Sequence, residues 1–165
     1  MQQHARIAVL GAGQFGTLHA RTLAGLPEAQ LVAIGDAAPE RAKALADELD
    51  VKSTFTDLPE FLKTNSVDGI VIATRTSTHV ELAHLALDAG IGVLIEKPVA
   101  ENSEDISPLL QHPAAARAMA GHICLFHSLI DPLLQRVQKE GFRTAHLVRH
   151  RPSWMCERFP EEHPI

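Results

Sequence analysis

Short apolar runs alternate with longer amphipathic stretches along most of the chain. The apolar runs are rich in Val, Ile, Leu and Ala and are bounded by glycine or polar residues, which is typical of buried parallel strands. Six strands are predicted, at 6–10, 31–35, 53–55, 69–73, 92–95 and 117–122. Helices are predicted at 15–26, 39–49, 58–63, 78–89, 103–110 and 132–140. This alternation predicts an α/β fold on a doubly wound parallel sheet of about six strands.

A glycine-rich turn follows the first predicted strand, where residues 11–16 read Gly-Ala-Gly-Gln-Phe-Gly. The first glycine permits a tight turn, the second lets a pyrophosphate approach the backbone, and the third lets the helix pack closely on the strand. The helix N-terminus would supply backbone N–H groups to the phosphates. The pattern predicts a dinucleotide site, although a glycine turn without a ligand would look the same. The predicted cofactor-binding residues here are Gly11, Ala12, Gly13, Gln14, Phe15 and Gly16.

Asp36 stands 20 residues after Gly16, at the end of the second predicted strand. A carboxylate at this place can bind the hydroxyls of the adenosine ribose and would repel a 2′-phosphate, so NAD is predicted in preference to NADP. Arg41, one helical turn further on, weakens that preference. The alternative role for Asp36 is to cap the turn or the next helix.

Two further motifs lie at the ends of the fourth and fifth predicted strands. Residues 73–79 read Ala-Thr-Arg-Thr-Ser-Thr-His, and residues 96–98 read Glu-Lys-Pro. Together with the glycine turn and Asp36, they make residues 6–122 resemble the N-terminal Rossmann domain of the glucose–fructose oxidoreductase, inositol dehydrogenase and MocA (Gfo/Idh/MocA) family. That family usually has Pro and Asn where this chain has Arg75 and Thr76. The loop is therefore expected to hold the cofactor somewhat differently.

The resemblance implies roles in both motifs. It places four residues of the first motif beside the cofactor: Thr74, Arg75, Thr76 and His79. For His79, packing at the start of a helix is an equal alternative. Glu96 would accept hydrogen bonds from the nicotinamide ribose. Lys97 would also contact the cofactor and is the predicted catalytic residue, whose ammonium stabilises charge on the substrate oxygen during hydride transfer; a surface lysine is the alternative. The Lys97–Pro98 bond is a candidate for the cis form.

These motifs predict the cofactor-binding half of an NAD(P)-dependent oxidoreductase, which moves a hydride between nicotinamide and a hydroxyl-bearing carbon of a sugar, cyclitol or related polyol. In the family that the chain resembles, a histidine of the second domain, often one helical turn after an aspartate, supplies acid/base catalysis. No Asp-x-x-x-His follows residue 122, so little turnover is expected from this chain alone. The alternative is a non-catalytic module that senses NAD(H) or supports a partner.

The regular alternation stops near residue 122. Beyond it we predict one helix, one strand at 144–151 and an irregular tail, which together cannot enclose a core. We therefore expect a dinucleotide-binding domain at 1–122 and, at 123–165, the start of an incomplete α+β domain for substrate binding or oligomerisation. A homo-oligomer is possible, since members of the family commonly associate through the second domain.

Composition and charge narrow the class of protein. The net charge of −5 argues against nucleic acid or an anionic membrane as the main partner. No apolar run approaches the length of a membrane span, and the N-terminus does not resemble a signal peptide. With two cysteines, too few for a disulfide framework, we expect a cytoplasmic protein. His122, Cys124 and His127 lack an obvious fourth ligand, so no metal site is predicted.

Overall fold

The computed structural model describes residues 4–141. The chain falls into two compact units, Met1–Ile123 and Cys124–Ile165, and the predicted boundary at 122/123 lies one residue from this division. That the second unit begins a further domain stays a prediction. The predicted strand at 144–151 and the tail after it lie outside the described residues.

The first unit is built on one parallel sheet. Its strands are β1 (Ala5–Leu10), β2 (Ala29–Gly35), β3 (Ser53–Phe55), β4 (Gly69–Ile72), β5 (Gly92–Ile95) and β6 (Ala118–Ala120). They lie in the order β3-β2-β1-β4-β5-β6, and every neighbouring pair is parallel. The predicted doubly wound, six-stranded Rossmann sheet is therefore confirmed.

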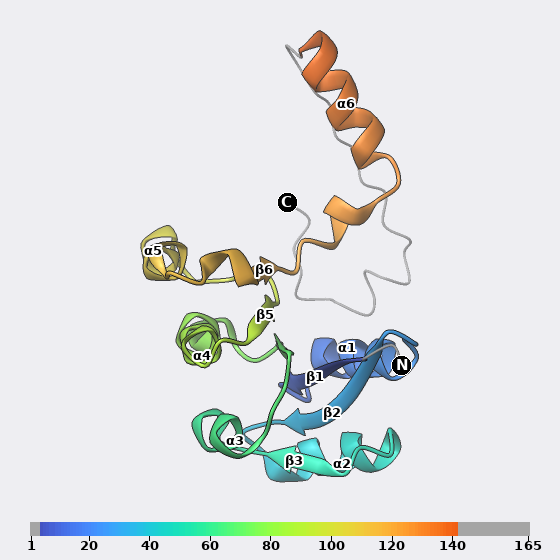
Figure 1. Ribbon diagram of the computed structural model, residues 1–165, viewed down its shortest axis with the longest axis vertical. Helices are drawn as coiled ribbons and strands as arrows, with labels where there is room; N and C mark the ends of the chain where they lie inside the picture. The colour runs from blue at the N-terminus through green and yellow to red at the C-terminus, as the bar shows by residue number, and fades with distance from the viewer. Residues whose placement is uncertain (1–3, 142–165) are drawn as a thin grey trace, which may run out of the picture. The chain divides into compact units, whose positions relative to one another are not determined.

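Helices cover both faces of this sheet, with α1 and α2 on one face and α3, α4 and α5 on the other (Figure 1). Their bounds are α1 (Gln14–Ala24), α2 (Pro39–Glu48), α3 (Leu58–Thr64), α4 (Thr76–Asp88) and α5 (Ser103–Gln111). Local sequence explains several of their ends. Pro39 occupies the first turn of α2, where its missing N–H has no helical partner to lose. Asp57 caps α3 by accepting from the Glu60 N–H at 2.7 Å.

The central strands contribute side chains to two hydrophobic cores, one on each face of the sheet. They do so because successive side chains of a strand point to opposite faces. On β1, Ala8 and Leu10 pack with residues of α3, α4 and α5, whereas Val9 packs with residues of α1 and α2. β4 repeats the pattern, with Ile70 and Ile72 in the first core and Val71 in the second. Burial on both faces explains why these strands read as unbroken apolar runs.

The structure departs from the sequence prediction at element ends. α4 begins at Thr76, two residues before the predicted start, because the Thr78 hydroxyl donates to the Arg75 carbonyl at 2.8 Å and closes the first turn. Two short 3₁₀ helices, η1 (Ala115–Arg117) and η2 (Ile123–Phe126), were not predicted. The second unit contains α6 (Ile130–Glu140). No helix among residues 4–141 is long and apolar enough to cross a membrane.

Candidate functional site

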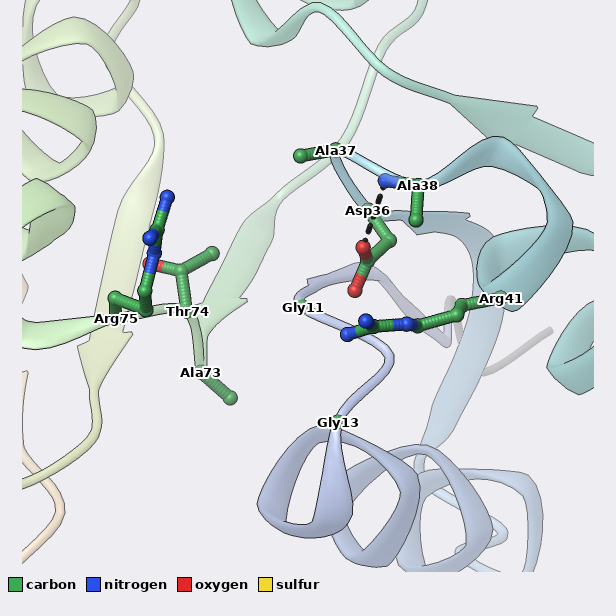
Figure 2. A pocket seen from close by; sticks show the side chains of 9 residues that line it. All are labelled: Gly11, Gly13, Asp36, Ala37, Ala38, Arg41, Ala73, Thr74 and Arg75. Carbon is green, nitrogen blue, oxygen red and sulfur yellow. Dashed lines mark hydrogen bonds between the residues drawn. The ribbon is translucent and has the colours of Figure 1, made fainter.

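A cleft of about 570 Å³ opens at the carboxyl ends of β1, β2 and β4. Here the order of the sheet reverses direction between β1 and β4, which is where open α/β sheets bind ligands. The loops after these three strands supply its walls (Figure 2). The lining residues are Gly11, Gly13, Asp36, Ala37, Ala38, Arg41, Ala73, Thr74 and Arg75.

The three glycines of the turn meet different surroundings. Gly11 has φ +105°, and an added Cβ would overlap the Ala73 carbonyl. At Gly16 an added Cβ would overlap the Gly11 carbonyl oxygen. The fold therefore requires glycine at both positions. At Gly13, which lines the cleft, an added Cβ would meet nothing within 4 Å.

The fold thus leaves open space above Gly13, next to the N-terminus of α1. Gly13 is the N-cap of α1, with ordinary extended dihedral angles and no side-chain cap. The first N–H groups of a helix have no partners within the helix and favour an anion. A cradle that a Cβ would fill, at the N-terminus of a helix, fits the pyrophosphate of a dinucleotide.

Asp36 joins the glycine turn to the loop after β2. Its carboxylate accepts from the Ala12 N–H at 2.7 Å and from the Ala38 N–H at 2.9 Å, and the residue is 9% exposed. Each oxygen of a carboxylate has more than one acceptor site, so the group can hold both loops and still accept from a ribose hydroxyl. Of the two roles expected for Asp36, the structure shows the turn-capping contacts directly and leaves the residue lining the cleft.

Two arginines line the cleft with Asp36. Arg41 extends from α2 and Arg75 from the loop before α4, on opposite walls (Figure 2). Neither guanidinium forms a hydrogen bond or an ion pair within residues 4–141. The cleft therefore presents two uncompensated positive charges and one carboxylate, a balance suited to an anionic ligand.

The loop between β4 and α4 is held by side-chain hydrogen bonds. The Thr78 hydroxyl donates its one proton to Arg75, so the Thr74 hydroxyl is the donor in its 2.8 Å contact with Thr78. Thr76, predicted to contact the cofactor, begins α4 and does not line the cleft.

His79 is 1% exposed and lies under this loop. Its Nδ1 lies 2.9 Å from the Pro98 carbonyl oxygen, and its Nε2 lies 3.1 Å from the Thr74 carbonyl oxygen. Carbonyl oxygens only accept, and a neutral imidazole carries one N–H, so both contacts are full hydrogen bonds only in the protonated ring. His79 thus ties the loop after β4 to the loop after β5 and offers neither nitrogen to a ligand in this structure.

The Glu-Lys-Pro segment follows β5, the strand next to β4. Lys97 is exposed, and its Nζ lies 5.4 Å from the centre of the Phe15 ring. The Lys97–Pro98 bond is cis, as the sequence suggested. Glu96 is 8% exposed, and its Oε2 accepts from the Lys97 N–H at 3.1 Å.

Sequence reasoning missed one residue at this place. The other Glu96 oxygen, Oε1, lies 2.7 Å from His19 Nε2. His19 comes from α1 and belongs to no motif, but it stands four residues after Phe15, so helical spacing could have placed both on one face. Among residues 4–141 no group of three or more His, Cys, Asp or Glu is placed to hold a metal ion.

Comparisons with known proteins agree with this geometry. A family profile described as an oxidoreductase family with an NAD-binding Rossmann fold matches residues 5–121. The chain is 32% identical over 146 residues to the myo-inositol 2-dehydrogenase of Thermotoga maritima, a match that covers 87% of this chain and 44% of that protein. It is 33% identical over 141 residues to the UDP-N-acetylglucosamine 3-dehydrogenase of Acidithiobacillus ferrooxidans, covering 84% of this chain and 42% of that protein.

The chain is also similar to solved structures of dehydrogenases. The apo scyllo-inositol dehydrogenase of Lactobacillus casei matches with a TM-score of 0.74 at 25% identity, over 84% of this chain and 42% of that one. The chain spans less than half the length of these relatives. Since the family profile covers most of its residues, the chain belongs to the Gfo/Idh/MocA oxidoreductase family and carries that family's NAD-binding Rossmann domain.

Proposed function

We propose that the chain is the cofactor-binding part of an NAD-dependent dehydrogenase that acts on a hydroxyl-bearing carbon of a cyclitol, sugar or related polyol. The observation that carries the cofactor site is the open space above Gly13. The fold explains why Gly11 and Gly16 lack side chains, but apart from its chain neighbours no atom of residues 4–141 lies within 4 Å of a Cβ added at Gly13. A ligand that needs this space explains the glycine there.

Different residues around the cleft would bind different parts of the cofactor. The turn at 11–16 would bind the pyrophosphate through backbone N–H groups. Asp36 would accept from the adenosine ribose and disfavour a 2′-phosphate, which makes NAD the preferred cofactor. Thr74 and Arg75, which line the cleft, would form the wall that faces the ribose and phosphates.

Lys97 and Glu96 would act at the nicotinamide end. When bound, NAD⁺ supplies a ring carbon that takes a hydride from the alcohol carbon, while the hydroxyl proton leaves to a base. The Lys97 ammonium would donate a hydrogen bond to the substrate oxygen and stabilise the charge that develops there. In this role Lys97 orients the oxygen and does not take the proton. We propose that the base lies outside the described residues.

The substrate class rests on the relatives. The Thermotoga maritima protein is named for myo-inositol and the Acidithiobacillus ferrooxidans protein for UDP-N-acetylglucosamine, and both compounds are polyhydroxylated rings. We propose such a ring as the substrate of the protein to which this chain belongs.

Calorimetric titration of the chain with NADH and NADPH tests the proposal. We expect NADH to bind more tightly than NADPH. A folded chain that binds neither would refute the cofactor site. In a second assay, NAD⁺ is offered with myo-inositol, scyllo-inositol or UDP-N-acetylglucosamine at high protein concentration, and NADH formation is followed. Slow turnover that Lys97→Ala abolishes would support the dehydrogenase, and turnover that Lys97→Ala leaves unchanged would refute the role of Lys97.

A further inference from the structure

His19 bonds the side chain of a residue 77 positions away in the sequence. Its Nε2 lies 2.7 Å from Glu96 Oε1. A carboxylate only accepts, so the ring nitrogen is the donor. The two side chains are 22% and 10% exposed, so this contact is largely shielded from water and is stronger than an exposed pair.

The contact belongs to a matched set along one face of α1. Phe15 and His19 stand one helical turn apart, and residues four apart in a helix are neighbours on its surface. Phe15 faces the Lys97 ammonium at 5.4 Å from its ring centre, and His19 holds the carboxylate of the preceding residue, Glu96. Helix α1 therefore contacts two consecutive residues of the Glu-Lys-Pro segment at once.

The Glu96 carboxylate has little freedom to rearrange. An ionised carboxylate out of water needs hydrogen-bond donors. Glu96 has two within the described residues: His19 Nε2 and the Lys97 N–H at 3.1 Å. Gly121 also lies close to this carboxylate, because a Cβ added there would be 3.3 Å from Glu96 Oε1. Without His19, the described residues would leave Glu96 only the 3.1 Å hydrogen bond from the Lys97 N–H, and the carboxylate could rotate about its side chain.

We propose that His19 is a positioning residue, which fixes the Glu96 carboxylate and, through the Lys97 N–H, the backbone that carries Lys97. This inference rests on the proposed function, because it assigns Glu96 and Lys97 to the nicotinamide end. The same helix begins at the turn that would hold the pyrophosphate. His19 thus fixes the nicotinamide end of the site relative to the phosphate end, through one rigid helix.

The test compares two ligands that differ at the nicotinamide end. NADH spans the whole site, whereas ADP has the adenosine and diphosphate but lacks the nicotinamide ribose. The affinity of NADH is measured by calorimetry, and that of ADP by displacement of NADH. In His19→Ala we expect NADH to bind about tenfold more weakly, the loss of one hydrogen bond to a charged group, while ADP affinity stays within about twofold.

Two variants separate positioning from stability. His19→Gln restores an N–H donor to Glu96, and we expect it to recover most of the NADH affinity. His112→Ala is the matched control, because His112 also pairs a largely buried ring with a carboxylate, Asp88, at 3.0 Å. Neither His112 nor Asp88 lines the cleft, so NADH affinity should not change. Urea unfolding of each variant shows that it is folded.

The outcomes are distinct. If the unaltered chain binds NADH but His19→Ala weakens NADH and ADP equally, His19 only supports α1 and the inference is overturned. It is also overturned if His19→Ala binds NADH normally, or if His19→Gln is as impaired as His19→Ala. If the unaltered chain binds no NADH, the proposed function itself fails, which no variant is needed to show.

Discussion

Single glycine-to-alanine substitutions in the glycine turn and at the end of α1 should distinguish an effect on stability from an effect on cofactor binding. Gly13, Gly16 and Gly25 are each replaced by Ala. Gly13 lies at the N-terminal end of α1 and Gly25 at its C-terminal end, outside the cleft. Because the same methyl group is added each time, differences between the variants report on the surroundings of each position.

The structure predicts the change in stability at each position. At Gly13, reduced freedom of the unfolded chain stabilises by about 0.4–1 kcal/mol, and replacing glycine by alanine at an N-cap costs about 0.5 kcal/mol, so the two nearly cancel. At Gly25 the methyl group would lie 3.6 Å from the Thr22 carbonyl oxygen, an ordinary contact, and little change is expected. At Gly16 it would overlap the Gly11 carbonyl oxygen, so α1 must move away from the turn. We expect the free energy of unfolding there to fall by about 3 kcal/mol or more.

The change in NADH affinity should follow a different order. The methyl group of Gly13→Ala would occupy the space above the turn and hold the pyrophosphate off the N–H groups. Loss of one hydrogen bond to a charged group weakens binding by roughly ten- to a hundredfold. Gly25→Ala should bind NADH normally. Urea unfolding followed by circular dichroism and calorimetric titration measure the two quantities. The reasoning is refuted if Gly13→Ala is as unstable as Gly16→Ala, or if it is stable and still binds NADH normally.

Three further substitutions test other contacts. His79→Ala removes a side chain that is 1% exposed and leaves two carbonyl oxygens without their partner, so the free energy of unfolding in urea should fall by about 2–4 kcal/mol; an unchanged midpoint would contradict this role. Asp36→Asn keeps an oxygen for one backbone N–H but loses the charge that repels a 2′-phosphate. Titrations should therefore show a smaller preference for NADH over NADPH. An unchanged ratio of the two affinities would argue against Asp36 as the discriminating group. The pKa of Glu48 is lowered, chiefly by the hydrogen bond that it accepts from Arg21. The stability that this pair contributes is therefore present above the ordinary carboxyl pKa of about 4.3. It is lost as the pH falls through the lowered pKa. In Glu48→Gln, urea unfolding at a series of acid pH values should therefore show a shallower fall in stability than in the unaltered chain, and parallel curves would contradict the assignment.

The sequence predicted the sheet well because its signal is local and repeated. Apolar runs such as 69–73 are unbroken since both faces of the strand are covered, and each run is followed by a helical pattern. The glycine turn was predicted for a similar reason, because three glycines at fixed spacing describe one local geometry. The 3₁₀ helices η1 and η2 escaped prediction, since three or four residues are too few to show a period.

Contacts between distant segments could not be predicted in this way. The two roles considered for His79 differ only in whether its nitrogens are free, and that depends on the Pro98 carbonyl, 19 residues away. Helical spacing places His19 on the same face of α1 as Phe15, but it does not show that this face meets Glu96, 77 residues away. A single sequence shows which residues lie on one helix face, but not which side chain of another loop meets that face.

These distant contacts bear on how the cofactor would bind. The Ala12 N–H bonds Asp36, which joins the loops after β1 and β2, and His79 joins the loops after β4 and β5. His19 joins α1 to Glu96 after β5. Loops from four strands are thus cross-linked by the protein's own hydrogen bonds. A ligand that enters such a site has few loops left to order, and the conformational entropy lost on binding is correspondingly small. The same cross-links explain why a substitution at His19, outside every motif, should reach the nicotinamide end of the site.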